Sequence, residues 1–156
     1  MDFPKIVSGG QTGADRAALD WAIDNGIPHG GWCPAGRLAE DGVIDSKYNL
    51  RETSKADYLQ RTEWNVRDSD ATVIFSIKAD LMGGSLATQK LADKHLKASL
   101  HLTSLQSPAE NATQLRGFIR KHEIKVLNIA GPRASGEPEL RPLVQTVLDE
   151  LFEIWG

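Results

Sequence analysis

Residues 5–16, KIVSGGQTGADR, carry the most informative pattern in this chain. Residues 5–8 are a short strand candidate that Gly9 and Gly10 stop, and small apolar residues then recur at helical spacing as far as residues 25–26. A strand that turns through glycines directly into a helix is typical of proteins in which helices cover a parallel sheet.

The same pattern recurs along the chain. Residues 71–76, ATVIFS, are the clearest strand because they are β-branched and apolar on both faces. A glycine turn at residues 82–85 then leads into a helix predicted over residues 86–97, with an apolar stripe of Leu86, Leu91, Ala92 and Leu96. Further strands are predicted within residues 27–33, 99–103 and 125–130, and further helices around 55–64, from an N-cap at Ser107 with Pro108 at N1, and over 138–152.

Alternation of strands and helices predicts an α/β fold: one doubly wound, Rossmann-like domain over residues 1–156. We expect a mainly parallel sheet of about five strands with helices on both faces. The 156 residues are too few for an eight-fold barrel.

The composition gives no indication of binding to nucleic acid, to a membrane or to a metal ion. Apolar residues make up 40% of the chain and charged residues 25%, and the net charge of -3 gives no general attraction to nucleic acid or to an anionic membrane. No apolar run approaches the roughly 20 residues that cross a bilayer, and the start lacks the pattern of a secretory signal, so we expect a cytoplasmic protein. Cys33 is expected at the end of a buried strand, and the four scattered histidines predict no metal site.

The first glycine turn is a candidate anion site, formed by Gly9, Gly10, Gln11, Thr12 and Gly13. Glycines let the backbone approach a ligand closely, and the free N–H groups at a helix N-terminus favour a phosphate. The Lys-Ser/Thr end of a nucleoside triphosphate loop is missing, and the spacing does not fit the dinucleotide fingerprint. The alternative is a tight turn with no ligand.

Two later turns occupy equivalent positions. Gly83, Gly84 and Ser85, with Thr88 one turn on, follow the strand at residues 71–76, and Arg133 lies in the turn after the last strand. Connections that leave the same edge of a parallel sheet form one crevice, so these residues are predicted to bind the same ligand as the first turn. For Arg133 the alternative is an exposed, hydrated side chain.

The long polar segment at residues 34–61 is predicted to act as a lid over the ligand. Arg51, Thr62 and Asn65 are its preferred ligand-binding members because polar groups cluster there, just before the clearest strand. Trp32 is expected to pack within the fold, with stacking on a pterin or a base as the alternative.

Catalysis is not indicated. The chain has neither a nucleophile elbow nor a carboxylate pair marked by its context. Asp15 and Asp70 are acids near strand ends, and their simpler interpretations are a helix first-turn residue and a turn residue. An enzyme is therefore less favoured than a binding protein, and the question stays open at this point.

Four segments together resemble the "putative molybdenum carrier" family over nearly the whole chain: residues 8–16, 30–37, 61–70 and 83–88. That family is similar to the Rossmann-like group that includes molybdenum-cofactor carrier proteins and the "lonely guy" phosphoribohydrolases, once described as lysine decarboxylases. The resemblance implies a Rossmann-like sheet, a homo-oligomer (dimer or tetramer) and a phosphate-bearing ligand, with molybdopterin, the organic part of the molybdenum cofactor, as the candidate.

The phosphoribohydrolases carry a Pro-Gly-Gly-x-Gly-Thr-x-x-Glu motif that this chain matches only in part. Aligned on Gly83 and Gly84, the motif places Leu86 at its third glycine, Ala87 at its threonine and Lys90 at its glutamate. Because the catalytic acid is missing, the resemblance does not carry the hydrolase activity over.

Two functions follow from the sequence. The first is a non-catalytic carrier that holds a phosphate-bearing small molecule at the glycine turns. The alternative is a hydrolase that processes a nucleotide or nucleoside monophosphate, or a nucleotide-sensing module.

Overall fold

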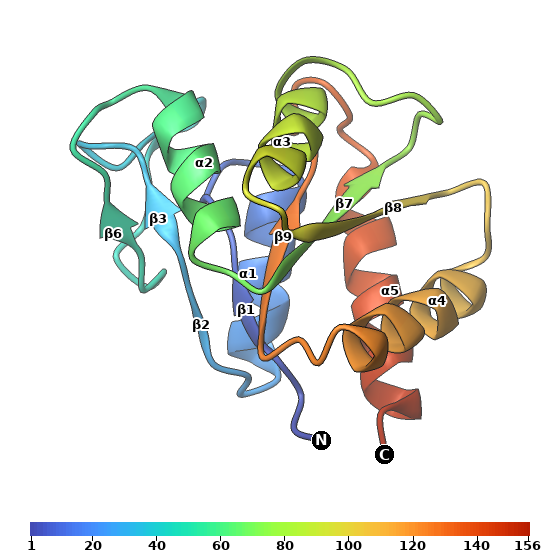
Figure 1. Cartoon of the computed structure of the whole chain (residues 1–156). Helices are drawn as coiled ribbons and strands as arrows, with labels where there is room; N and C mark the ends of the chain where they lie inside the picture. Colours follow the sequence, from blue (N-terminus) through green and yellow to red (C-terminus); the bar gives the residue numbers. More distant parts are fainter.

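The computed structural model describes residues 1–156 and confirms the predicted α/β architecture. Five strands form one sheet in the order β2-β1-β9-β7-β8, and every neighbouring pair is parallel (Figure 1). The strands are β1 (Lys5–Val7), β2 (His29–Gly30), β7 (Ala71–Ser76), β8 (Ala98–Thr103) and β9 (Val126–Ala130).

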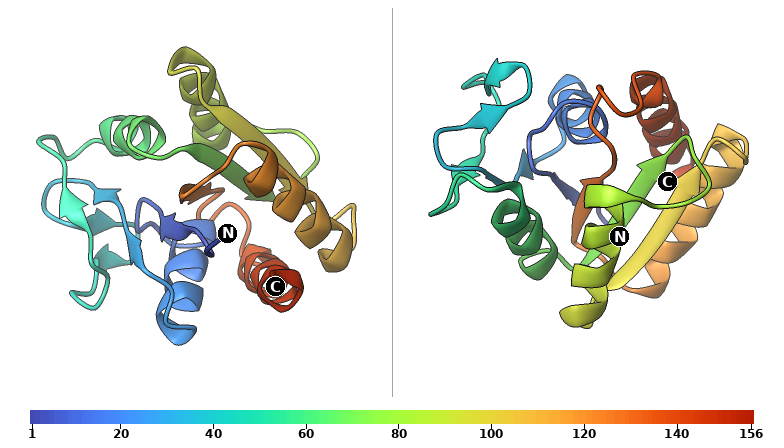
Figure 2. Two further views of the ribbon diagram at one scale, coloured as in Figure 1. Left: turned by 60° about the horizontal axis from the view of Figure 1, so that its bottom comes forward. Right: turned by 90° about the horizontal axis from the view of Figure 1, so that it is seen from above.

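Helices cover both faces of the sheet. One layer contains α1 (Ala14–Asp24), α4 (Pro108–Lys121) and α5 (Leu140–Ile154), which pack side by side, and the other contains α2 (Tyr58–Arg67) and α3 (Gly83–Lys94) (Figures 1 and 2). As predicted, the Ser107 side chain caps α4 by accepting a hydrogen bond from the Glu110 N–H, and Pro108 is its first residue.

The hydrophobic core lies on one side of the sheet. Its main cluster of 21 buried residues contains members of α1, α4 and α5 but none of α2 or α3. In β7, Val73 and Phe75 point into this cluster, whereas Thr72 and Ser76 alternate with them and belong to the opposite face. The α2 and α3 side is therefore the more polar face of the sheet.

Two predicted elements were wrong in detail. Helix α3 runs from Gly83 to Lys94 rather than over residues 86–97. Leu96 therefore lies beyond its end and is 94% exposed instead of packing in the apolar stripe. Residues 27–33 divide into β2 and β3 (Trp32–Cys33) because Gly31, with a φ of 131°, bends the chain between them. Cys33 is fully buried at the end of β3, as expected.

The predicted lid segment has its own structure. Strands β4 (Leu38–Ala39) and β5 (Gly42–Val43) form a hairpin, and β6 (Arg51–Glu52) pairs with β3. Arg37 fixes the segment internally because its guanidinium donates to four backbone carbonyls, those of Ile44, Asp45, Tyr48 and Leu50.

The two ends of the chain meet. The indole N–H of Trp155 donates to the carbonyl of Met1 at 3.0 Å, while β9, the last strand, lies in the centre of the sheet. Joining the ends and opening the chain before β7 would number the strands 2-1-3-4-5, a common doubly wound order. The fold is therefore a circular permutation of a doubly wound sheet. None of its helices has the length and apolar character that crossing a membrane requires.

Candidate functional site

A cavity of about 450 Å³ opens at the carboxyl edge of the sheet, where β9 ends at Ala130 and Gly131 follows; both residues line the cavity. On the two sides of β9 the chain leaves the sheet toward opposite faces. Strand β1 is followed by α1 on one face, and β7 is followed by α3 on the other. Such a divergence leaves a crevice in which doubly wound proteins bind ligands. The position of the cavity agrees with the prediction of one shared crevice.

Two guanidinium groups line the cavity from different segments. Arg61 extends from α2, and Arg133 comes from the turn after β9. Both lie against the ring of Tyr58, at 5.8 Å and 5.6 Å from its centroid. Only 14% of the Arg61 side chain is exposed, and burial lowers the pKa of this guanidinium while Asp15 opposes the shift.

Asp15 is the single carboxylate among the residues that line the cavity. Its Oδ2 lies 3.4 Å from Nη1 of Arg61 and accepts a hydrogen bond of 3.2 Å from the N–H of Gln11. Burial raises the pKa of Asp15, and the nearby Arg61 charge acts in the opposite direction. One carboxylate against two guanidinium groups leaves the cavity with an excess of positive charge.

Two buried polar atoms beside the cavity have no hydrogen-bond partner: Nε of Arg61 and Oε1 of Gln11. Both side chains are lining residues. Most buried polar atoms in proteins are paired, and a charged group without a full set of partners is particularly costly. Arg61 and Gln11 therefore keep unused hydrogen-bonding capacity beside the cavity.

The N-terminus of α3 borders the same cavity. Its N-cap residue, Met82, offers no side-chain hydrogen bond to the first turn. A Cβ atom built on Gly84 would meet nothing within 4 Å, and the φ of Gly84 is not positive, so neither packing nor backbone geometry requires glycine there. The first turn of α3 thus presents open backbone and helix N–H groups to the cavity.

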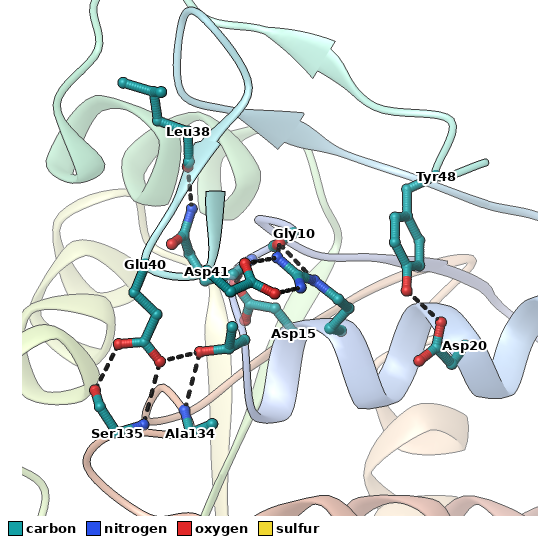
Figure 3. Close-up of polar contacts among 12 residues, drawn as sticks. Gly10, Asp15, Asp20, Leu38, Glu40, Asp41, Tyr48, Ala134 and Ser135 are labelled. Carbon is teal, nitrogen blue, oxygen red and sulfur yellow. Dashed lines mark hydrogen bonds and ion pairs between the residues drawn. The ribbon is translucent and has the colours of Figure 1, made fainter. Parts of the chain in front are cut away.

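The first glycine turn is different, because the protein's own groups fill it. A Cβ on Gly9 would overlap the Arg61 side chain, and one on Gly13, whose φ is 81°, would overlap the carbonyl of Pro132. The hydroxyl of Thr12 bonds Glu40 from the β4–β5 hairpin, and Nε2 of Gln11 donates to the carbonyl of Leu38 (Figure 3). Little of this turn remains open to a ligand.

The structure brings only part of the predicted site together. Gln11, Gly84, Ser85, Thr88 and Arg133 line the cavity, and Gly9 lines a small adjoining hollow with Arg61. The remaining glycine-turn residues, Gly10, Thr12, Gly13 and Gly83, belong to the two turns without lining the cavity.

Arg51 lies elsewhere. It stands on β6 over the ring of Trp32, at 4.8 Å from the centroid, in a separate hollow of about 310 Å³ that Lys5 also lines. Of the other preferred lid residues, Thr62 lines the main cavity, whereas the side-chain amide of Asn65 bonds the backbone N–H and carbonyl of Trp32. Trp32 packs edge-on against Trp64.

The sequence-based prediction missed the central role of Arg61 and of Tyr58. Arg61 lies four residues before the buried Asn65, so the two share the inner face of α2. That spacing was the available signal, although an arginine on one face of a short polar helix is more often exposed. No group of three or more His, Cys, Asp or Glu side chains lies together in a way that could hold a metal ion.

Comparison with known proteins agrees with this architecture. Residues 6–152 match the model of the family described as "Circularly permutated YpsA SLOG family". A crystal structure at 1.45 Å resolution, of a protein from Syntrophus aciditrophicus SB titled "Putative molybdenum carrier protein", is 47% identical and superimposes with a TM-score of 0.93. The match covers 96% of this chain and 94% of that one. No protein of curated function matches the chain.

Proposed function

Because this chain belongs to the circularly permuted YpsA SLOG family, we propose that it is a binding protein for a phosphate-bearing small molecule, whose phosphate lies between Arg61, Arg133 and the start of α3. A carrier role at the level of the family is supported by the 47% identical relative, which is titled a molybdenum carrier protein. For this chain, the molybdenum cofactor in its molybdopterin form is the candidate ligand.

The observation that carries the proposal is the incomplete bonding of Arg61. Its guanidinium is buried, its Nε has no partner, and its contact with Asp15 is long at 3.4 Å. A phosphate offers several acceptor oxygens in a geometry that suits a guanidinium fork. Binding it would add acceptors for the guanidinium, balance the excess positive charge and use the open N–H groups of α3.

Part of the cavity lining is apolar and aromatic. Leu59 and Met82 line the cavity and are 59% and 69% exposed, and Tyr58, whose ring contacts both guanidinium groups, lines it as well. Apolar and aromatic side chains beside a few convergent polar groups are typical of small-molecule sites of this size. The expected ligand therefore joins a phosphate to a flat or apolar body, as a pterin or a nucleoside does.

Binding without chemistry is favoured over hydrolysis. A hydrolase needs an acid or base free to exchange a proton with the ligand. Asp15 is the only carboxylate that lines the cavity, and it already accepts the Gln11 N–H and faces Arg61. The nucleotide-processing alternative would have to use this residue, so loss of turnover in Asp15→Asn is the observation that would favour it.

Calorimetric titration with inorganic phosphate tests the proposal. Arg61→Met should weaken binding by about 10- to 100-fold, since a charged hydrogen-bonding group is lost. Arg67→Met is the matched control: Arg67 lies on the same helix, is paired with Asp68 and does not line the cavity, so its affinity should be unchanged. Equal binding by wild type and Arg61→Met would refute the site.

Native mass spectrometry of the protein purified without added ligand then addresses the identity of the ligand. Release of a pterin with molybdenum or tungsten on mild denaturation would support the carrier function. Recovery of a nucleotide would favour the alternative module.

A further inference from the structure

One carboxylate of the protein is bound in the way that a ligand anion would be. Glu40 accepts hydrogen bonds from the hydroxyl of Thr12, from the N–H of Ser135 at 3.2 Å and from the hydroxyl of Ser135 at 2.6 Å (Figure 3). The Thr12 oxygen is itself oriented by the N–H of Ala134, at 3.1 Å. We call these donors, Thr12 Oγ1 with the N–H and Oγ of Ser135, the Thr12–Ser135 subsite.

Glu40 reaches the subsite from an exposed hairpin rather than from the core. It lies at the turn between β4 and β5, and its own side chain is exposed. The hydrogen bonds from Ser135 and Thr12, followed by the charge of Arg133, hold the pKa of Glu40 below its usual range. The subsite therefore favours a negative charge, which an exposed side chain of the hairpin supplies in this structure.

The Thr12–Ser135 subsite adjoins the proposed phosphate site. Ser135 lines the main cavity, as does its neighbour Arg133, and Gln11 precedes Thr12 and lines the cavity as well. The two segments that supply the donors of the subsite, the first glycine turn and the turn after β9, thus also contribute residues to the lining of the cavity. A ligand that fills the cavity would therefore lie beside Ser135, one of the two residues that form the subsite.

We propose that the Thr12–Ser135 subsite is a second anion subsite, which Glu40 occupies when the protein is empty, and that the ligand carries two anionic groups. One group would bind beside Arg61 and Arg133, and the second would displace Glu40 from Thr12 and Ser135. The proposal rests on the function proposed above and adds the class of ligand: a diphosphate or a molecule with a phosphate and a second anionic centre.

The neighbouring residue of the hairpin provides a matched control. Asp41 binds Arg16 through two hydrogen bonds, of 2.5 Å and 3.0 Å, and so ties the same hairpin to α1 without touching the subsite. Glu40→Ala empties the subsite and loosens the hairpin, whereas Asp41→Ala only loosens the hairpin. A comparison of the two variants separates competition by the carboxylate from mobility of the hairpin.

The test is a calorimetric titration of the two variants and the wild type with orthophosphate and with pyrophosphate. Glu40→Ala should bind pyrophosphate about tenfold more tightly than the wild type, since its second phosphate no longer competes with a bound carboxylate, and orthophosphate should change by less than about twofold. Asp41→Ala should match the wild type for both. Adding Ser135→Ala to Glu40→Ala should remove most of the gain for pyrophosphate.

The outcomes separate this inference from the function on which it rests. If orthophosphate binds in an Arg61-dependent way but Glu40→Ala improves both anions equally, or neither, the second subsite is refuted and the proposed function stands. If Asp41→Ala raises the affinity for pyrophosphate as much as Glu40→Ala does, the cause is the loosened hairpin rather than the lost carboxylate, and the subsite is again refuted. If neither anion binds to any of the proteins, both proposals fall.

Discussion

The two glycine turns that lead into α1 and α3 look alike in the sequence and differ in the structure. Each follows a strand of the same parallel sheet and opens a helix without a side-chain N-cap. Around the first turn, an added Cβ on Gly9 or Gly13 would collide with protein atoms. At the second, an added Cβ on Gly83 or Gly84 would meet nothing within 4 Å.

The difference shows that glycines serve two physical purposes here. In the first turn they let Arg61, the turn after β9 and the hairpin pack closely against the backbone. In the second they leave space, because no protein atom occupies the volume that a side chain would take. Close packing inside the protein and close approach of a ligand demand the same residue, so glycine alone does not identify a binding site.

The largest effect is expected from filling the first turn. Gly13→Ala should lower the free energy of unfolding by about 4 kcal/mol, because the φ of 81° disfavours alanine and the new methyl group would overlap the Pro132 carbonyl. Chemical denaturation measures this loss. In the second turn, Gly84→Ala should change the stability by less than about 1 kcal/mol. Similar losses for both variants would contradict the proposed difference between the turns.

Removal of the Asp15 charge should have the next largest effect. Asp15→Asn should cost about 3 kcal/mol of stability in anion-free buffer, because Arg61 then remains buried without its carboxylate. Sulfate, which does not titrate near neutral pH, should raise the melting temperature of this variant more than that of the wild type. An equal response to sulfate would show that the anion does not bind beside Arg61.

The same carboxylate predicts a pH dependence. Burial raises the pKa of Asp15, so protonation begins at a higher pH than for an exposed aspartate and removes the negative charge from the cavity. The affinity of the wild type for sulfate should therefore rise as the pH is lowered from about 7.5 to about 5, and Asp15→Asn should show a flatter profile. Calorimetry at several pH values measures both proteins.

Gly84→Ala should separate binding from stability in the second turn. Its methyl group would occupy space in the cavity and hinder the approach of an anion to the first N–H groups of α3. We expect the affinity for phosphate to fall about tenfold, while the melting temperature stays close to that of the wild type. Unchanged affinity would place the anion away from α3.

The smallest effects distinguish two hydroxyls of α3. The Thr88 hydroxyl donates to the Gly84 carbonyl at 2.8 Å, so Thr88→Val should change the phosphate affinity by less than about twofold. The Ser85 side chain lines the cavity and makes no hydrogen bond within the protein, so Ser85→Ala should weaken binding about fivefold. The reverse order would mean that Thr88 turns toward the ligand.

Much of the fold could be predicted because the signals are local. The β-branched run at β7, the Ser107-Pro108 start of α4 and the apolar spacing of α5 each define an element within a few residues. Errors occurred where local rules were ambiguous. Gly83 looks like a turn residue but is the first residue of α3. The helix also ends at Lys94, so Leu96, with a φ of 54°, lies outside the apolar stripe in which it was placed.

The site was predictable only in part, because its charges come from distant segments. Arg51 and Arg61 lie close together in the sequence, yet pairing of β6 with β3 carries Arg51 to Trp32, while the inner face of α2 carries Arg61 into the cavity. Such placements depend on contacts between residues far apart in the chain, which periodicity and residue type do not reveal.

The sequence by itself determined the alternation of strands and helices, the positions of the glycine turns and hence the edge of the sheet at which the cavity was to be expected. The tertiary structure alone decided that β9 enters the centre of the sheet, that Glu40 and Arg61 fill the first turn and that the second stays open. The physical reason is that backbone preferences act over a few residues, whereas burial and charge pairing depend on which surfaces meet after folding.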